Sequence, residues 1–257
     1  MFYDVDFHIH TCFSDGEGTI EDILSISKER KLRAIAITDH FEPRDSRDPK
    51  KSIEEFRRYI RVIRCKAVSC GLKVFVGIET SLFFEVEEEL REEVDLVIRS
   101  VHFFPPKTDI SCYSLFDERL WEIYKNEVLE LLQIRFTDIA GHIMGYFPLP
   151  SEWVKGLTFT ERRELEKVIR ERFFDEEWQE RVIEQAIKNN VAIEIHNPTS
   201  TPDENFIRQA VSRGVKLSLG SDAHLLGWVG KVDYGKSMFL RLQIPKKNLF
   251  WPRERGD

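Results

Sequence analysis

Residues 5–38, VDFHIHTCFSDGEGTIEDILSISKERKLRAIAIT, predict a strand, a helix and a second strand. The runs 5–10 and 33–38 are short and rich in Val, Ile and Phe, which is typical of buried strands, and the amphipathic stretch between them is typical of a helix. Thr19 and Asp22 stand three residues apart at the start of that stretch, as a capping box requires. Two buried strands joined by a helix form the repeating unit of parallel α/β folds.

The same alternation continues along the chain. Seven strands are predicted in all, at 5–10, 33–38, 73–79, 95–101, 138–143, 191–196 and 215–220. A second capping box, Ser52 with Glu55, begins another helix that Gly71 closes, and further helices are expected at 116–133, 160–171, 176–189 and 203–212. Because 257 residues are ordinary for one barrel, we expect a single α/β domain over residues 1–257.

Composition excludes several classes of protein. A formal charge of −7 disfavours stable binding of long nucleic acid through phosphate contacts, although it leaves small phosphorylated substrates open. No run approaches the roughly 20 apolar residues of a membrane span, and the first residues lack a secretory pattern, so we expect a cytoplasmic protein that does not bind membranes. The four cysteines form no CxxC pair and are expected to be free thiols.

The highly charged stretch 151–190 is expected to be the solvated outer face of helices rather than a nucleic-acid or partner surface. Neither GxGxxG nor GxxxxGK[ST] is present, which disfavours a dinucleotide enzyme and a P-loop NTPase. The oligomeric state does not follow from the sequence.

Histidines and acidic residues stand at the carboxyl ends of the predicted strands. His8 and His10 end the first strand, His40 follows the second, and the others lie at or after later strands: Glu79, His102, His142, His196, Asp222 and His224. In a parallel barrel these strand ends open on one rim, where active sites are assembled. We therefore expect these side chains to meet, with His196 facing the substrate or supporting the ligands rather than binding metal.

This set of side chains predicts a multinuclear metal site. His8 and His10 alternate along a strand, so that both imidazoles point to the same side. Gathering many imidazoles and carboxylates without a cation would bury like charges and unsatisfied polar groups. Mixed imidazole and carboxylate ligation favours two or three Zn, Mn or Fe ions, and the absence of thiolate ligands disfavours a structural zinc site.

The motifs DFHIHTCFSDG, AITDH, VGIET, RSVH, AGHIM and GSDAH occur in this order between residues 6 and 224. Through them the chain resembles the PHP (polymerase and histidinol phosphatase) family of phosphoesterases. The resemblance implies a distorted (β/α)7 TIM-like barrel, consistent with the seven strands counted above, and a site that commonly holds three metal ions.

Carried over by position, the resemblance implies nine metal ligands: His8, His10, Asp15, His40, Glu79, His102, His142, Asp222 and His224. Asp15 lies in the turn-forming stretch SDGEG, where a turn-capping carboxylate is the alternative. Glu79 is expected to bridge two ions, because a carboxylate can offer one oxygen to each. His196 stands in IEIHNP where similar proteins often have Asn, which puts the contacts to substrate in doubt.

The expected reaction is hydrolysis of a phosphoester by metal-activated water, with Glu79 as a catalytic ligand and His196 or His224 as the proton donor to the leaving oxygen. Three cations of the rim loops, Arg44, Arg47 and Lys107, are predicted to bind the phosphate, with solvated loop residues as the alternative. The aromatic side chains of this rim are expected either to wall the pocket or to belong to the core: Phe41, Phe103 and Phe104.

Several functions remain open at this point. A phosphatase for a small phosphate monoester, similar to histidinol-phosphate phosphatases, is favoured. The alternatives are a phosphoesterase for nucleotides or nucleic-acid ends, including the proofreading nucleases attached to polymerases, which the absence of a polymerase region from this sequence disfavours. From other classes, a catalytically inactive regulatory module would be expected to have lost ligands, and a structural zinc scaffold would be expected to contain cysteine ligands.

Overall fold

The predicted strands form one parallel sheet in the computed structural model, which describes residues 2–42, 52–68 and 70–254. Within these residues the strands follow the order β1 to β7, each hydrogen-bonded to its neighbours in the sequence. Their bounds are Val5–Ile9 (β1), Ala34–Ile37 (β2), Lys73–Thr80 (β3), Leu96–Arg99 (β4), Ile139–Ala140 (β5), Ala192–His196 (β6) and Leu217–Gly220 (β7). Every pairing is parallel, as the alternation with helices predicts.

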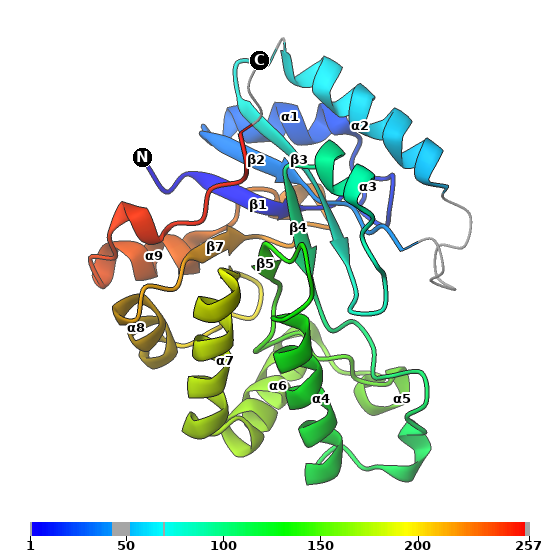
Figure 1. Ribbon diagram of the computed structural model, residues 1–257, viewed down its shortest axis with the longest axis vertical. Helices are drawn as coiled ribbons and strands as arrows, with labels where there is room; N and C mark the ends of the chain where they lie inside the picture. The colour runs from blue at the N-terminus through cyan, green and yellow to red at the C-terminus, as the bar shows by residue number, and fades with distance from the viewer. Residues whose placement is uncertain (1, 43–51, 69, 255–257) are drawn as a thin grey trace.

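The sheet curls until its first and last strands meet. Ile9 and Ala223 form a parallel bridge, and the backbone N–H of His10 donates to the carbonyl oxygen of Ala223 at 3.1 Å. The result is a nearly closed barrel of seven strands (Figure 1). The predicted distorted (β/α)7 barrel is confirmed.

Helices surround the barrel on its outer side (Figure 1). Their bounds are Ile20–Glu29 (α1), Ile53–Val68 (α2), Glu88–Glu93 (α3), Glu118–Leu131 (α4), Ser151–Val154 (α5), Phe159–Phe173 (α6), Glu176–Asn189 (α7), Glu204–Ser212 (α8) and Asp233–Arg241 (α9). The capping box of α1 forms as predicted, since the Asp22 amide donates to Thr19 Oγ1 and the Thr19 amide donates to an Asp22 carboxylate oxygen. These two hydrogen bonds stabilise the first turn of the helix.

Three helices were not predicted, because their local signals are weak. Helix α3 has six residues, α5 has four, and α9 has no side-chain cap. Gly235 lies inside α9, where a Cβ atom would stand 2.4 Å from Leu219 Cδ2 of β7. That glycine weakens the helical pattern in the sequence, but it lets the helix pack closely on the barrel.

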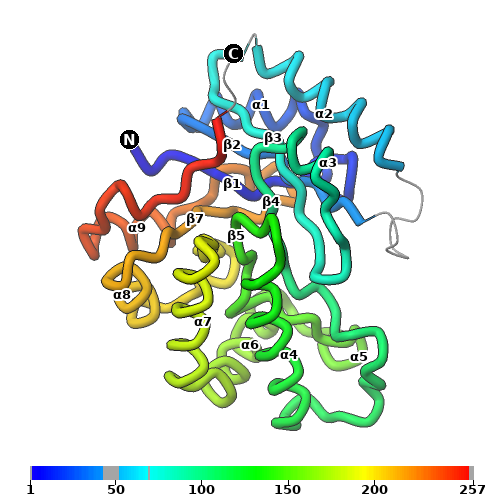
Figure 2. The backbone as a smooth tube through the Cα atoms, in the orientation of Figure 1, coloured from blue at the N-terminus to red at the C-terminus, as the bar shows by residue number. Residues whose placement is uncertain are grey.

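Apolar side chains of the strands and helices pack together in two clusters. The larger cluster contains Trp121 of α4 and Trp178 of α7, and the smaller one contains Phe56 of α2. Figure 2 shows the chain winding once round the barrel in sequence order, so that residues 217–250 return beside β1. Packing between the strands and the surrounding helices therefore fixes the position of the strands.

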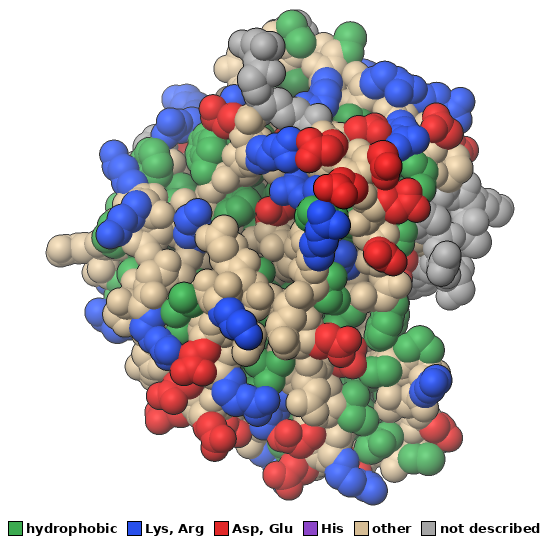
Figure 3. Space-filling view, in the orientation of Figure 1, with side chains coloured by type: hydrophobic (Ala, Val, Ile, Leu, Met, Phe, Trp, Pro, Cys, Tyr) green, Lys and Arg blue, Asp and Glu red, His purple; other side chains and the backbone are tan. Residues whose placement is uncertain are grey.

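The surface carries charges of both signs. On the face shown in Figure 3, acidic and basic side chains lie interspersed over the helices, including the region of α7. This agrees with the expectation of a solvated outer face for the α7 part of the stretch 151–190, whereas Glu152, Trp153 and Arg162 near its beginning line a cavity. Among the described residues there is no helix with the length and hydropathy needed to cross a bilayer. The four cysteines are free thiols, three of them exposed and Cys70 buried.

Candidate active site

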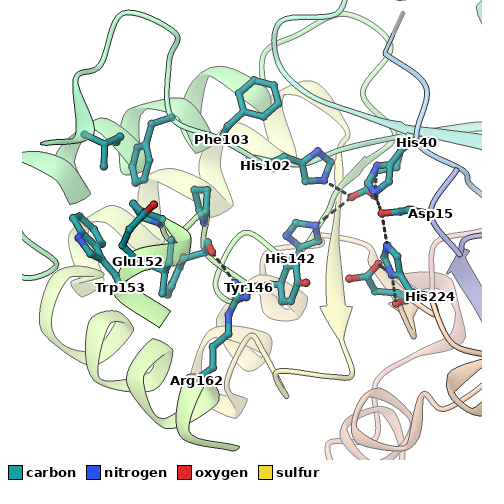
Figure 4. Close-up of a pocket in the computed structure, with 18 of the residues that line it drawn as sticks. Asp15, His40, His102, Phe103, His142, Tyr146, Glu152, Trp153, Arg162 and His224 are labelled. Carbon is teal, nitrogen blue, oxygen red and sulfur yellow. Dashed lines mark hydrogen bonds and ion pairs between the residues drawn. The ribbon is translucent and has the colours of Figure 1, made fainter. Parts of the chain in front are cut away.

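The structure brings all nine predicted ligand side chains together at the carboxyl end of the barrel. His8 lies in β1 with His10 directly after it, Glu79 lies in β3, and the remaining six stand in the segments that follow strands: Asp15, His40, His102, His142, Asp222 and His224. Figure 4 shows several of these side chains facing one another across the rim. Residues up to 216 positions apart thus share one site because parallel strands end at the same edge.

Glu79 is the centre of this cluster. Its side chain is buried, and its two oxygens face different histidines. Oε1 lies 3.0 Å from His102 Nε2 and 3.2 Å from His142 Nε2. Oε2 lies 3.1 Å from His8 Nε2 and 3.2 Å from His40 Nδ1. A carboxylate with separate partners on each oxygen has the arrangement expected of a bridging ligand.

The potential ligand atoms fall into three overlapping groups, in each of which they lie within 4.8 Å of one another. One group is His8, His10, Glu79 and Asp222; the second is His40, Glu79 and His102; the third is His10, Asp15, His40 and His224. His142 joins the cluster through Glu79. The sharing of Glu79, His10 and His40 between groups means that these sites adjoin.

Asp15 is the most exposed member, with 57% of its side chain accessible. Its carboxylate oxygen Oδ2 lies 3.3 Å from His224 Nε2 and 3.7 Å from His40 Nε2. The side chain therefore turns toward the cluster, which is the orientation required of a ligand. That it binds metal stays a prediction.

Buried polar atoms without hydrogen-bond partners test whether these residues fit cations. Within the described part of the chain, four such atoms belong to the cluster: His8 Nε2, His10 Nδ1, His10 Nε2 and Asp222 Oδ1. They approach one another closely, for example at 3.2 Å between His10 Nε2 and Asp222 Oδ1, without hydrogen-bond alignment. Buried polar groups are rarely left unpaired, so the donor set fits divalent cations placed between these atoms.

The electrostatics of the cluster agree with this fit. Burial lowers the pKa of His10, but the carboxylates of Asp222 and Glu79 outweigh burial and raise it to about 10. Burial likewise opposes the charged form of Glu79, yet the histidines His8, His102 and His40 hold its pKa well below the usual range. The carboxylates attract positive charge strongly, and bound cations would supply it in place of protons.

Sequence reasoning missed Glu194, which is buried in β6. Its Oε1 lies 2.7 Å from His8 Nδ1, and its Oε2 accepts a hydrogen bond of 2.7 Å from the backbone N–H of His142. A Cβ atom at residue 220 would lie 2.0 Å from Oε1, so Gly220 leaves room for this carboxylate. Glu194 therefore orients His8 and anchors the segment of His142. An acid inside the apolar run VAIEI was the available signal.

Asp39 was also missed, and it orders the turn that carries Asp15. It accepts hydrogen bonds from the Thr11 amide at 2.7 Å, the Ser14 hydroxyl at 2.6 Å and the Tyr59 hydroxyl at 2.6 Å. These bonds fix the backbone of residues 11–14 immediately before Asp15. Its position one residue before His40 in the sequence was the signal.

A cavity of about 810 Å³ opens directly onto the cluster. One wall contains the predicted ligands Asp15, His40, Glu79, His102, His142, Asp222 and His224. The rest of the lining, here called the aromatic wall, includes Phe103, Phe104, Ile110, Tyr113, Phe147, Leu149 and Trp153. Figure 4 shows Glu152 and Trp153 of α5 across the cavity from the histidines, with Tyr146 and Arg162 between them.

The cations predicted to bind phosphate have different outcomes. Arg44 and Arg47 lie outside the described residues. Lys107 is exposed and is not among the residues that line the cavity, whereas Arg162, which was not predicted, lines it. The Arg162 guanidinium stacks 4.6 Å from the centre of the Tyr146 ring and donates from Nε to Glu166 Oε1 at 3.0 Å. Arg162 lies in the charged stretch 151–190, where no local sequence pattern distinguishes it from the neighbouring charged residues.

The remaining predicted side chains divide between pocket and core. Phe103 and Phe104 line the cavity, while Phe41 is buried against Phe56 in the core. His224 lines the cavity and is partly exposed. His196 is buried, does not belong to the described lining of the cavity, and lies 3.2 Å from Asp222 through Nε2 and Oδ2.

Comparison with known proteins gives a consistent result. A family model described as the PHP domain matches residues 6–198. Two curated relatives are named probable phosphatase. The one from Shewanella piezotolerans is 24% identical over 97% of this chain and 89% of the relative. The one from Acetivibrio thermocellus is 22% identical over 95% of this chain and 89% of the relative.

Solved structures share the fold. The histidinol phosphate phosphatase of Lactococcus lactis, complexed with zinc, L-histidinol and phosphate, superposes with a TM-score of 0.61 at 18% identity over 94% of both chains. A chain from the metal-dependent tyrosine phosphatases of Bacillus subtilis and Streptococcus pneumoniae superposes with a TM-score of 0.50 at 14% identity. The match covers 95% of this chain and 89% of that chain.

Proposed function

This chain belongs to the PHP domain family and is a metal-dependent phosphoesterase, and we propose that its substrates are small phosphate monoesters of the histidinol phosphate kind. The observation that carries the proposal is the continuous cavity of about 810 Å³, which runs from the histidine and carboxylate cluster to the aromatic wall. It has room for a phosphoryl group at one end and a small organic group at the other.

The proposed cofactors are two or three divalent transition-metal ions, Zn, Mn or Fe, held by the nine clustered side chains. Glu79 is assigned as the ligand shared between ions, since its two oxygens face different histidines. The absence of cysteine from the three ligand groups, and their mixture of imidazole and carboxylate, favour this class of metal. Zinc is also the metal in the Lactococcus lactis phosphatase.

Divalent cations bound there supply a water nucleophile at neutral pH and neutralise charge on the phosphoryl oxygens. The chain's own residues hold the reacting groups in place. Glu194 and Asp39 keep His8 and the turn before Asp15 in position through the hydrogen bonds described above. His224, which lines the cavity, is the proposed proton donor to the leaving oxygen.

Arg162 is proposed to contribute positive charge to substrate binding. It lines the cavity between the cluster and the aromatic wall, and Glu166 and Tyr146 fix its guanidinium. An arginine held in this way presents its donors to phosphate oxygens at little conformational cost. The proposed roles of Arg44 and Arg47 concern residues outside the described part of the chain, and Lys107 is exposed and absent from the described lining of the cavity.

The aromatic wall is proposed to receive the leaving group. Histidinol, which is bound together with phosphate in the Lactococcus lactis structure, is a small organic alcohol. The ligands of that protein and the aromatic side chains of this cavity together support a small monoester as substrate.

A substrate panel tests the proposal. Protein loaded with Mn²⁺ or Zn²⁺ is assayed with histidinol phosphate, phosphotyrosine, nucleoside monophosphates, sugar phosphates and short single-stranded DNA. We expect the highest kcat/KM for a small monoester with a ring-bearing leaving group. Preference for DNA ends would instead favour a nuclease, and no turnover of any phosphoester by metal-loaded protein would contradict the function.

A further inference from the structure

His196 is the last residue of β6, and its ring lies in a chain of hydrogen bonds that ends at Asp222. It is completely buried. Its Nε2 lies 3.2 Å from Asp222 Oδ2, and its Nδ1 lies 2.7 Å from the Thr199 hydroxyl. The Thr199 hydroxyl in turn lies 2.8 Å from that of Thr201. Both ring nitrogens therefore have one partner each, and neither partner is substrate.

The direction of these bonds follows from their chemistry. An ionised Asp222 carboxylate only accepts hydrogen bonds, so His196 donates from Nε2. In the neutral imidazole Nδ1 must then accept, and the Thr199 hydroxyl donates to it. The Thr199 oxygen remains free to accept from Thr201. One consistent chain thus runs from Thr201 through Thr199 and His196 to Asp222.

The surrounding backbone makes this chain rigid. The amide of His196 donates to the Thr201 carbonyl at 2.8 Å, and that of Thr201 donates back at 3.3 Å. Gly145 packs against both threonines, because a Cβ atom there would stand 2.5 Å from Thr199 Oγ1 and 2.9 Å from Thr201 Oγ1. Residues 196–201 are consequently held from two sides.

Asp222 stands in a turn after β7. Its φ of 48° lies in the left-handed region, which aspartate adopts more readily than most residues other than glycine. Its Oδ1 faces the cluster at 3.2 Å from His10 Nε2 and has no hydrogen-bond partner among the residues that the structure describes. Among the described residues, His196 gives the Asp222 side chain its one hydrogen bond, through Oδ2, and this bond restrains the rotation of the carboxylate that sets where Oδ1 points.

We propose that His196 is a positioning residue that orients Asp222 Oδ1 toward the metal cluster through the Thr201–Thr199–His196 chain. This rests on the proposed assignment of Asp222 as a ligand. It differs from the role of proton donor expected from the sequence, because a general acid must reach the leaving oxygen and the buried ring of His196 does not line the described cavity.

Two substitutions of the same residue give a matched test. In His196→Gln the side-chain amide can place a donor near the position of Nε2, whereas in His196→Asn the shorter amide reaches only the position of Nδ1. We expect His196→Asn to lower the affinity for Zn²⁺ by roughly 10–100-fold, the usual effect of losing an outer hydrogen-bond partner, and His196→Gln to restore most of it. Affinity is measured by competition with a chromophoric chelator, independently of activity.

Leaving-group dependence separates positioning from proton donation. Both variants are assayed with an alkyl phosphate, whose leaving oxygen needs a proton, and with p-nitrophenyl phosphate, whose leaving group needs none. We expect His196→Asn to lose kcat by the same factor on both substrates. A loss confined to the alkyl phosphate, with unchanged Zn²⁺ affinity, would identify His196 as a general acid and overturn the proposal.

Two further variants separate an error in the assignment of Asp222 as a ligand from an error in the role of His196. Asp222→Asn should weaken Zn²⁺ binding more than any change at His196; if it does not, the ligand assignment itself fails. If Asp222→Asn weakens binding but His196→Asn binds Zn²⁺ as the wild type does, only the role of His196 is overturned. Should His196→Asn not fold, Thr199→Val removes the donor to Nδ1, and an unchanged Zn²⁺ affinity in that variant would equally contradict the proposal.

Discussion

The two walls of the active-site cavity are built by different parts of the chain. The metal-facing wall consists of side chains at or just after the ends of barrel strands, and each of them lies close to another member of the cluster. The aromatic wall comes from two segments that connect strands, residues 103–113 and 147–153, the second of which runs into the short helix α5. Strands fixed by the core position one wall, and connecting segments provide the other.

This difference assigns separate tasks to the two walls. Ligand atoms must lie within a few tenths of an ångström of their places, which rigid strand ends achieve and loops seldom do. Selection of a leaving group tolerates more variation, and loops change without disturbing the core. Substitutions on the two walls should therefore affect different measured quantities: metal content for one, and substrate preference for the other.

Replacement of Glu79 should give the largest effect. We expect Glu79→Gln to abolish hydrolysis and release metal, a loss beyond the roughly 10–100-fold typical of an outer hydrogen-bond partner, because both carboxylate oxygens face histidines of the cluster. Metal content by elemental analysis and kcat/KM are measured together, with circular dichroism as the control for folding. Full activity in this variant would refute the ligand assignment.

Two buried glutamates provide a direct contrast between the walls. Glu194 holds His8, whereas Glu166 accepts from the Tyr146 amide at 2.9 Å and from Arg162 beside the aromatic wall. Glu194→Gln should weaken metal binding by roughly 10–100-fold. Glu166→Gln should leave metal affinity unchanged and raise KM. Equal metal loss in both variants would remove the distinction between the walls.

Truncation of the aromatic wall should change preference rather than chemistry. Trp153→Ala removes a large side chain from the cavity, and we expect kcat/KM to fall by roughly tenfold for substrates with a ring-bearing leaving group. Hydrolysis of a methyl phosphate should change little, and metal content should stay constant. A uniform decrease for both substrates would mean that this wall does not contact the leaving group.

A cap on an outer helix gives the smallest expected effect and serves as a baseline. Asp203 begins α8 by accepting from the Phe206 amide at 2.9 Å. Asp203→Ala should cost about 1 kcal/mol of unfolding free energy, or about 2–4 °C in Tm, without altering kcat/KM or metal content. Changed kinetics would indicate that general destabilisation contributes to the other results.

The strands and the metal-facing wall were predictable because their signals are local. Apolar runs identify each strand, and His8, His10 and Asp222 stand next to them in readable motifs. Parallel topology then brings these residues to one rim. Short helices such as α3 and α5 were missed, since four to six residues carry too little periodicity to detect.

The supporting contacts and the aromatic wall could not be predicted in the same way. Glu194 reaches His8 across 186 positions, and Arg162 enters the cavity from a helix whose charged residues look alike in sequence. The hydrogen bond between His196 and Asp222 joins residues 26 positions apart, and no local pattern predicts it. These features follow from packing in three dimensions.

Anomalous X-ray diffraction from crystals of the metal-loaded protein, recorded at the absorption edges of zinc, manganese and iron, tests the central claim most directly. We predict two or three peaks enclosed by the nine clustered side chains, one pair of them bridged by Glu79. Full phosphoester hydrolysis by protein that shows no such peak, or peaks located away from this cluster, would contradict the account.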